Sequence, residues 1–245
     1  MWGGEVLTLE LESTIGYLAK DINKLRSKSV AYVTARSMTV AAEIAIADLQ
    51  IEAKKDLHKP TRWTLNSVFR YPFKVVPANL TIRFGFKDRV ASGTPAGEYL
   101  NVLVIGDRRP LKPIEEILQR KGKIPRNSSI VPIRSEVQPF DEHGNLPGSF
   151  YRALVARLSE ESRDYFIIKS LGQKLKPGIY KRIGSKKKGK QPRGYKQLFT
   201  INYRLPFYTA QFPVPKILQT SFMKNFKVVF ALEIRNELEV YGKRA

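Results

Sequence analysis

The sequence predicts an α+β fold, in which a long N-terminal helix and a C-terminal helix frame an antiparallel β-sheet with a basic hairpin loop. Apolar residues recur at helical spacing over residues 14–57 and again after Pro215, short segments between them alternate as strands do, and a lysine-rich run with glycines joins two of these segments. We expect residues 1–60 to hold a strand and the long helix, and residues 61–245 to hold an α+β domain with the basic loop 184–196. At a length of 245 residues, the two parts are expected to form one compact structural unit.

The N-terminal region changes from strand-like to helical periodicity. Residues 5–11 place Leu7, Leu9 and Leu11 at every second position, which predicts a short strand. Residues 14–57 follow a helical pattern without proline, as one continuous helix or as two in tandem with a break near residues 27–29. The many alanines in this stretch favour close packing against another helix.

The middle of the chain holds shorter elements. Residues 64–71 are typical of a short helix or turn, residues 79–88 alternate as a half-buried strand does, and residues 101–105 are either a strand or the lead into a helix. Helical spacing returns at residues 113–121 and 148–161, which predicts two short helices.

The last third of the chain predicts three strands and a helix. A strand at residues 164–170 is followed by strands at residues 178–183 and 197–203, which we expect to pair as a hairpin with the basic loop at its tip. Pro213 and Pro215 then open the final helix, since proline is tolerated in the first turn of a helix.

Positive charge is concentrated after the N-terminal helix. The 43 Lys and Arg and the 22 Asp and Glu give a formal net charge of +21, to which residues 1–57 contribute −1. No acidic residue lies between Asp164 and Glu233, a window that contains fifteen Lys and Arg. The candidate contacts for phosphate or an acidic partner are the basic residues of the predicted hairpin: Lys181, Arg182, Lys186, Lys187, Lys188, Lys190, Arg193 and Lys196.

Two interpretations of this basic region stay open. It contacts nucleic-acid phosphates, or it is a solvated loop that aids solubility or pairs with an acidic neighbouring subunit. No aromatic residue lies inside the lysine run, which favours contact with the phosphate backbone over base stacking.

Residue types that build metal, redox and nucleophilic sites are scarce. The chain has no Cys and only two His, His58 and His143, which excludes a disulfide framework, a thiolate metal site and a multi-histidine centre. We therefore expect no cofactor. No uninterrupted apolar run approaches the roughly 18–20 residues of a spanning helix, and no signal peptide is visible, so we expect a soluble protein that does not bind membranes.

Catalytic motifs are not found in the sequence. The one cluster with acid–base residue types is Asp141-Glu142-His143-Gly144-Asn145, whose composition is that of a surface turn. Phosphate-loop, nucleophile-elbow and two-metal patterns are missing, and we expect a protein that is not an enzyme. Arg108 and Arg109 either contact a partner's carboxylate or phosphate or cap local carbonyl groups in a solvated turn.

Several short motifs are spread over residues 35–240. They are Thr61-x-Trp63-Thr64-Leu65-Asn66, Glu98-Tyr99-Leu100, Gly106-Asp107-Arg108-Arg109-Pro110-Leu111-Lys112-x-x-Glu115-x-x-Leu118, Phe140-Asp141-x-x-Gly144-Asn145, Tyr165-Phe166 and Leu175-x-Pro177-Gly178-Ile179-Tyr180. Together with the helical ends and the Lys/Arg tract, this series resembles virion proteins of tailed bacteriophages, of the minor tail protein Z or tail-completion (neck) type.

The resemblance implies a structural viral protein, a subunit of an oligomeric ring at the neck or upper tail that completes the tail or connects head to tail around the DNA channel. Implied partners are further copies of the chain and the portal, adaptor or tail-tube proteins, with double-stranded DNA in the channel as another candidate. The protein would be made in the host cytoplasm and reside in the virion. The alternatives are a tail hub or fibre-attachment adaptor and a non-specific nucleic-acid-binding protein. Copy number, symmetry, exact position and tail type stay open.

Overall fold

The computed structural model describes residues 27–87, 94–135, 138–159, 164–169, 175–184 and 194–242. The strand predicted at residues 5–11 and the start of the predicted long helix, residues 14–26, lie outside this part of the chain. Within it the protein is α+β, as predicted, with a long helix toward each end and antiparallel sheets between them in sequence.

The chain divides into two compact units. Unit 1 comprises residues 1–106 and 209–245, and unit 2 comprises residues 107–208, so that unit 2 is inserted into unit 1. The boundary expected near residue 60 falls inside unit 1, because the long helix before it packs against the C-terminal helix.

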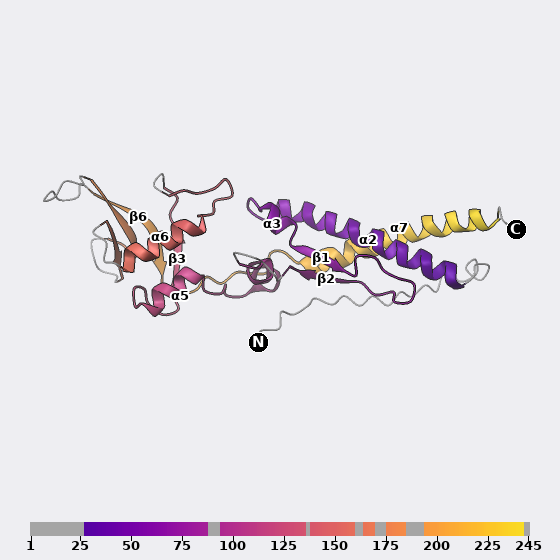
Figure 1. The fold of residues 1–245 in the computed structure, drawn as a ribbon, viewed down its shortest axis with the longest axis horizontal. Coiled ribbons are helices and arrows are strands. Elements are labelled where there is room, and N and C mark those ends of the chain that lie inside the picture. Colours follow the sequence, from indigo (N-terminus) through magenta and orange to yellow (C-terminus); the bar gives the residue numbers. More distant parts are fainter. Residues whose placement is uncertain are drawn as a thin grey trace. The chain divides into compact units, whose positions relative to one another are not determined.

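Unit 1 is built on two long helices that lie beside a two-stranded sheet (Figure 1). Its elements are α2 (Ser27–Asp56), α3 (Arg62–Leu65), β1 (Val68–Tyr71), β2 (Arg83–Phe86), α4 (Ala96–Asn101), the π-helical turn η1 (Val102–Gly106) and α7 (Val214–Gly242). α2 is uninterrupted over its 30 residues, so the predicted long helix is continuous from Ser27 onward.

The two long helices run antiparallel. Ser221 of α7 donates a hydrogen bond to Asp48 of α2 at 2.5 Å, and Arg36 near the start of α2 forms an ion pair at 3.2 Å with Glu233, further along α7. The order of these two contacts fixes the relative direction of the helices and the level at which their residues meet.

The core of unit 1 lies between α2, α7 and the two-stranded sheet. Three α2 side chains with no exposed surface are small and let neighbouring elements approach the helix closely: Ala41, Ala42 and Ala45. Ile82 and Phe84, which share one face in the alternation predicted over residues 79–88, are each 1% exposed, and the Phe84 ring packs edge-on against Phe222 of α7. Leu80, which the alternation places on the same face, is exposed and lies outside β2.

Two ambiguous segments of unit 1 take a definite form. The stretch predicted as a short helix or turn at residues 64–71 contains the end of α3 and then β1, which pairs with β2 in the register Val68↔Phe86. Residues 101–105 form no strand, since α4 continues directly into the π-helical turn η1.

α2 is also long and apolar enough over Ser29–Asp56 to cross a membrane, judged by length and composition alone. The sequence gives no uninterrupted apolar run here, because Arg36, Glu43, Asp48 and Glu52 interrupt it. A helix in the core of a soluble protein has the same character, and the alanine face of α2 is buried within unit 1.

Unit 2 is a four-stranded antiparallel sheet with two helices, α5 (Pro113–Arg120) and α6 (Gly148–Ser159). The strands are β3 (Ser129–Pro132), β4 (Tyr165–Ile168), β5 (Gly178–Ile183) and β6 (Gly194–Asn202), in the spatial order β3-β6-β5-β4. The two helices, the strand β4 and the β5–β6 hairpin confirm the sequence predictions. Strand β3 was not predicted.

One hydrophobic core holds unit 2 together. Leu118 of α5 and Leu154 of α6 pack with Ile179 and Phe199 from the central strands, and all four side chains are at most 2% exposed. The core covers one face of the sheet, so the hairpin at the end of β5 and β6 extends from a rigid support.

The two ends of unit 2 are held together where the chain enters and leaves it. Arg108 and Phe207 form an isolated antiparallel bridge, and the backbone amide of Tyr208 donates to the carbonyl oxygen of Asp107 at 2.9 Å. The chain therefore enters and leaves unit 2 at one paired position.

Candidate polyanion-binding surface

The basic surface is built on the β5–β6 hairpin. Its strands pair without a gap from Tyr180↔Gln197 to Ile183↔Gly194, and Lys181 lies opposite Lys196. The tip of the hairpin, residues 185–193, lies outside the described residues, and with it five predicted contacts: Lys186, Lys187, Lys188, Lys190 and Arg193. The other three predicted contacts, Lys181, Arg182 and Lys196, stand at the base of this tip.

A close approach between strands fixes the other end of the hairpin. A Cβ atom added at Gly178 would lie 2.4 Å from the carbonyl oxygen of Phe199, so only glycine fits there without a backbone shift. The register shifts between Ile179 and Tyr180, which marks a bulge in the β5–β6 ladder.

On one face of the sheet, cations gather around Tyr165 of β4. The Arg157 guanidinium of α6 lies 5.2 Å and the Lys181 ammonium 5.9 Å from the centre of the Tyr165 ring. Arg157 also donates a hydrogen bond to the Tyr165 hydroxyl at 3.0 Å. Lys196 shares this face, because residues directly opposite on antiparallel strands point the same way. Electron-rich aromatic faces lower the cost of placing like charges together.

Aromatic side chains on the other face hold Arg182. Its guanidinium lies 5.2 Å from the centre of the Phe166 ring, which stacks on Tyr180 and meets Tyr195 edge-on with centroids 5.2 Å apart. Tyr195 is 51% exposed. Burial raises the pKa of Tyr180, whose hydroxyl donates to the carbonyl oxygen of Lys176. The base of the hairpin thus presents cations on both faces of the sheet.

The aromatic partners of these cations were missed from the sequence. They lie in the strands and not inside the lysine run, and their pairing with Lys181 and Arg182 depends on strand register. The adjacent pairs Tyr180-Lys181 and Tyr195-Lys196 were the available signal.

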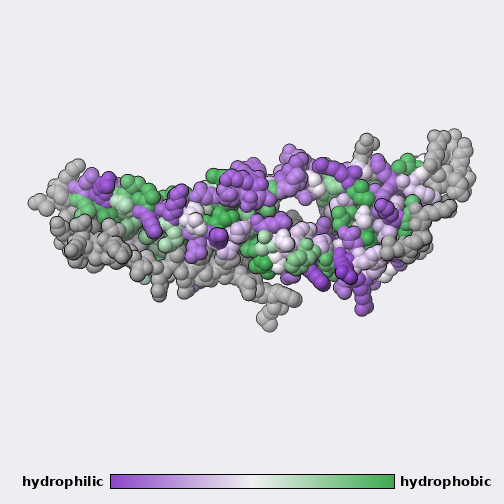
Figure 2. Space-filling model, turned by 180° about the vertical axis from the view of Figure 1, so that it is seen from behind, coloured by the Kyte–Doolittle hydropathy of each residue, from purple (hydrophilic) through white to green (hydrophobic). Residues whose placement is uncertain are grey.

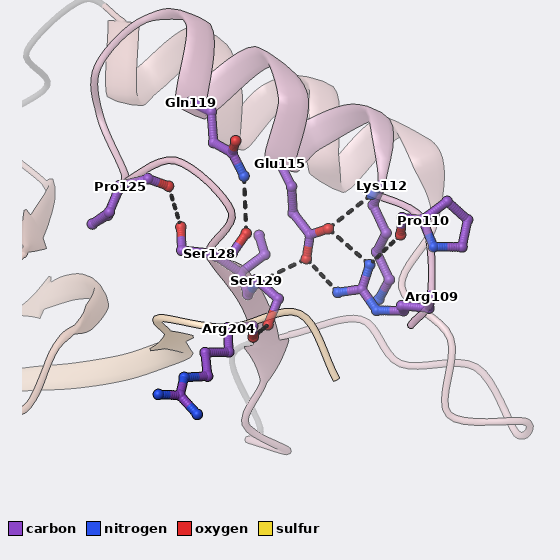
Figure 3. A network of polar contacts seen from close by, with 10 residues as sticks. Arg109, Pro110, Lys112, Glu115, Gln119, Pro125, Ser128, Ser129 and Arg204 are labelled. Carbon is purple, nitrogen blue, oxygen red and sulfur yellow. Dashed lines mark hydrogen bonds and ion pairs between the residues drawn. The ribbon is translucent and has the colours of Figure 1, made fainter. Parts of the chain in front are cut away.

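Arg109 belongs to a buried network centred on Glu115 (Figure 3). The Glu115 carboxylate has no exposed surface and accepts four hydrogen bonds: two from the Arg109 guanidinium at 2.8 and 2.5 Å, and one each at 2.8 Å from the backbone amides of Lys112 and Ile130. Arg109 also donates to the carbonyl oxygen of Pro110 at 2.8 Å. Arg109 therefore contacts groups of its own unit, as the interpretation of local carbonyl capping expected, and its main partner is the Glu115 carboxylate.

Electrostatics within the network are strong. Burial lowers the pKa of Arg109, but the hydrogen bonds and the charge of Glu115 outweigh it, and the pKa is raised. Burial, followed by the charge of Arg109, lowers the pKa of Lys112. The network joins α5 to β3 through Ile130, and it therefore serves the architecture of unit 2.

The acid–base cluster forms a turn. The carboxylate of Asp141 accepts the backbone amide of Asn145 at 2.7 Å, and Gly144 has a φ of +84°. This amide, with further help from the Asn145 side chain and from His143, lowers the pKa of Asp141. In the described part of the chain, no group of three or more His, Cys, Asp or Glu side chains could hold a metal ion.

Comparison of the chain with known protein families, curated proteins and solved structures finds no match.

Proposed function

We propose that the protein is a structural component of a tailed-bacteriophage virion, a subunit of an oligomeric ring at the neck or upper tail whose basic hairpin contacts a polyanion. The support for the phage assignment is the resemblance to the minor tail protein Z or tail-completion group over residues 35–240. The support for the polyanion contact is the hairpin itself.

The observation that carries the polyanion contact is the register of β5 and β6. It places Lys181, Arg182 and Lys196 at the base of a tip that contains five further cations in its sequence. Unit 2 has 23 Lys and Arg against nine Asp and Glu, so it contributes +14 of the net charge of +21. Such a field attracts phosphates or an acidic protein surface without reading sequence.

Lysine contacts to phosphates suit a subunit that lines a DNA channel. DNA that passes through a channel presents every base pair in turn, so a subunit lining it gains from contacts to phosphates and not to base edges. The double-stranded DNA in the channel and an acidic neighbouring subunit both offer anionic oxygens to the lysines, and competing duplex displaces only the first of these partners directly.

The test of the polyanion contact is duplex binding at several salt concentrations. We expect replacement of Lys186, Lys187, Lys188 and Lys190 by Ala to weaken binding and to reduce the slope of log K against log salt by about 3 to 4, since each phosphate contact contributes about 0.9. The control replaces four exposed lysines of unit 1, Lys54, Lys55, Lys74 and Lys87, by Ala. Equal loss in both variants, or no binding by the unchanged protein, would reject DNA as the partner.

The phage assignment is tested in particles. We expect the protein in purified virions, and we expect particles assembled without it to lack joined, complete tails. Complete infectious particles without this chain would overturn the assignment.

The two alternatives differ in assembly. A tail hub or fibre-attachment adaptor would be found at the distal part of the tail by labelling, whereas a non-specific nucleic-acid-binding protein would be missing from virions. The exposed Tyr195 beside Arg182 is the observation that favours the second alternative, because an exposed ring can stack on a base.

A further inference from the structure

We infer that copies of this chain associate through the outward faces of α2 and α7, so that α2 of one copy meets α7 of the next. The inference deepens the proposed function and rests on it in one respect, that the subunits assemble into a ring. The outer α2 stripe is Val40, Ile44, Ala47 and Ile51, and the outer α7 stripe is Lys224, Val228, Ala231 and Leu232.

α2 carries more apolar surface than the described residues of unit 1 cover. Its inner face, with the three buried alanines, packs within the unit 1 core, yet the outer α2 stripe continues at spacings of four, three and four residues. That spacing is typical of a helix seam. Ile51 is 51% exposed and Ala47 is exposed, while Val40 and Ile44 are half-buried. A helix with apolar stripes on two opposite faces buries both of them only when a second element covers the outer stripe.

α7 also has a buried inner face and an exposed outer face. Its inner face repeats Phe222, Phe226, Phe230 and Ile234 at every fourth position, in contact with the unit 1 cores. The outer α7 stripe lies two positions further along the helix, almost opposite, and Val228 and Leu232 are 56% and 54% exposed. Hydrophobic residues reach the surface over the part of unit 1 that holds the two helices (Figure 2).

The charges around the two stripes are complementary. α7 has no acidic residue from Val214 to Leu232, where it carries Lys216, Lys224 and Lys227. The half of α2 that lies beside this stretch carries four acidic residues, Glu43, Asp48, Glu52 and Asp56, against Lys54 and Lys55. A contact of α2 with the α7 of a second copy therefore attracts, whereas α7 against α7 brings like charges together.

The levels of the two stripes favour a closed assembly. Asp48 lies opposite Ser221 and Arg36 opposite Glu233, so Val40 and Ile44 lie at nearly the same level along the helix pair as Val228 and Lys224. A contact between stripes at one level relates successive copies by rotation with little translation along the helices. Heterologous contacts of this kind close as rings, whereas a large translation gives open filaments.

The experiment measures the mass of the full chain by light scattering after size exclusion. Ala47→Glu with Ile51→Glu removes the outer α2 stripe, and Val228→Glu with Leu232→Glu removes the outer α7 stripe. We expect each double variant to be monomeric, because an unpaired charge in an apolar contact weakens it strongly. The control, Phe73→Glu with Val76→Glu, changes two exposed apolar residues of unit 1 that belong to neither stripe and should assemble as the unchanged protein does.

Mixing distinguishes this arrangement from a symmetric contact. Each double variant keeps one intact stripe, so an equimolar mixture should form a one-to-one dimer and nothing larger. A dimer formed by either double variant alone would overturn the inference. Should a double variant lose its far-ultraviolet circular dichroism, Lys224→Glu with Lys227→Glu tests the same contact by charge, and we expect it to weaken association at least about ten-fold at low salt.

The two proposals fail separately. Oligomers that persist in both double variants would overturn this inference and leave the proposed ring in place. An unchanged protein that stays monomeric at all concentrations would overturn both the inference and the ring. Vesicle binding lost with the outer α2 stripe would assign that face to a lipid surface and overturn the inference.

Discussion

The two units differ in the side chains that they bury. Unit 1 buries small apolar side chains, so that Ala41, Ala42 and Ala45 let other elements approach α2 closely. Unit 2 buries an ionised carboxylate, Glu115, and satisfies it with four hydrogen bonds. Both units have a hydrophobic core, and the stability of unit 2 depends in addition on completing a buried polar network.

The difference extends to the surface. Unit 2 carries +14 within residues 107–208, whereas unit 1 carries the remaining +7 and exposes apolar residues on both long helices. Like charge repels, so unit 2 is the poorer surface for self-association and the better one for a polyanion. The exposed apolar helix faces thus belong to unit 1, and most of the net positive charge belongs to unit 2.

The largest expected effect follows from breaking the Glu115 network. We expect Glu115→Ala to destabilise unit 2 by about 3–5 kcal/mol, because it leaves the Ile130 amide without its acceptor and removes the carboxylate that pairs with the Arg109 guanidinium, which keeps its hydrogen bond to the carbonyl oxygen of Pro110. Urea unfolding followed by circular dichroism measures this. Both tryptophans, Trp2 and Trp63, belong to unit 1, so their fluorescence follows unit 1 alone. The exposed neighbour Glu116→Ala is the control, and equal destabilisation by both changes would contradict the role of the network.

A smaller effect is expected from volume in unit 1. We expect Ala45→Leu to destabilise unit 1 by about 1–3 kcal/mol, because the added atoms have no space at a position without exposed surface. The matched control is Ala47→Leu on the outer α2 stripe, which should change stability by no more than about 0.5 kcal/mol. Tryptophan fluorescence during urea unfolding measures both, and similar effects at the two positions would contradict the packing described here.

The smallest effect concerns the turn at Asp141. Its pKa is lowered in the folded protein, so the contribution of this carboxylate is present above the unfolded value and is lost as the pH falls through the folded value. We expect the amide resonance of Asn145 to titrate with a midpoint below 3.8, the ordinary value, and this titration to disappear in Asp141→Asn. A midpoint above 3.8 would show that the hydrogen bond does not form in solution.

Local periodicity predicted most of the elements. The helix α2 from Ser27, the helices α5, α6 and α7, and the β5–β6 hairpin all have their signals within a single segment of the sequence. Strand β3 was missed because it has only four residues, the last of which is Pro132, and its position depends on pairing with the distant β6 and on the hydrogen bond from Ile130 to Glu115. The division into units was missed because it follows from the packing of α2 on α7, which are far apart in sequence.

The candidate site was predicted in its charge but not in its construction. The basic residues were visible as a run, and Lys181, Arg182 and Lys196 stand where a hairpin base was expected. The contacts of Lys181 with Tyr165 and of Arg182 with Phe166 arise from the register between β4 and β5, Tyr165↔Lys181 and Phe166↔Tyr180, which no local pattern reveals.

The bridge between Arg108 and Phe207 has a mechanical consequence. Tension applied at the two ends of the chain reaches the paired position of Asp107 and Tyr208 before it reaches any strand of the four-stranded sheet. These backbone hydrogen bonds carry the tension until they break, so that none of it acts on the rest of unit 2 before then. A subunit pulled from both termini would therefore extend first in unit 1, while the sheet that carries the lysines keeps its shape.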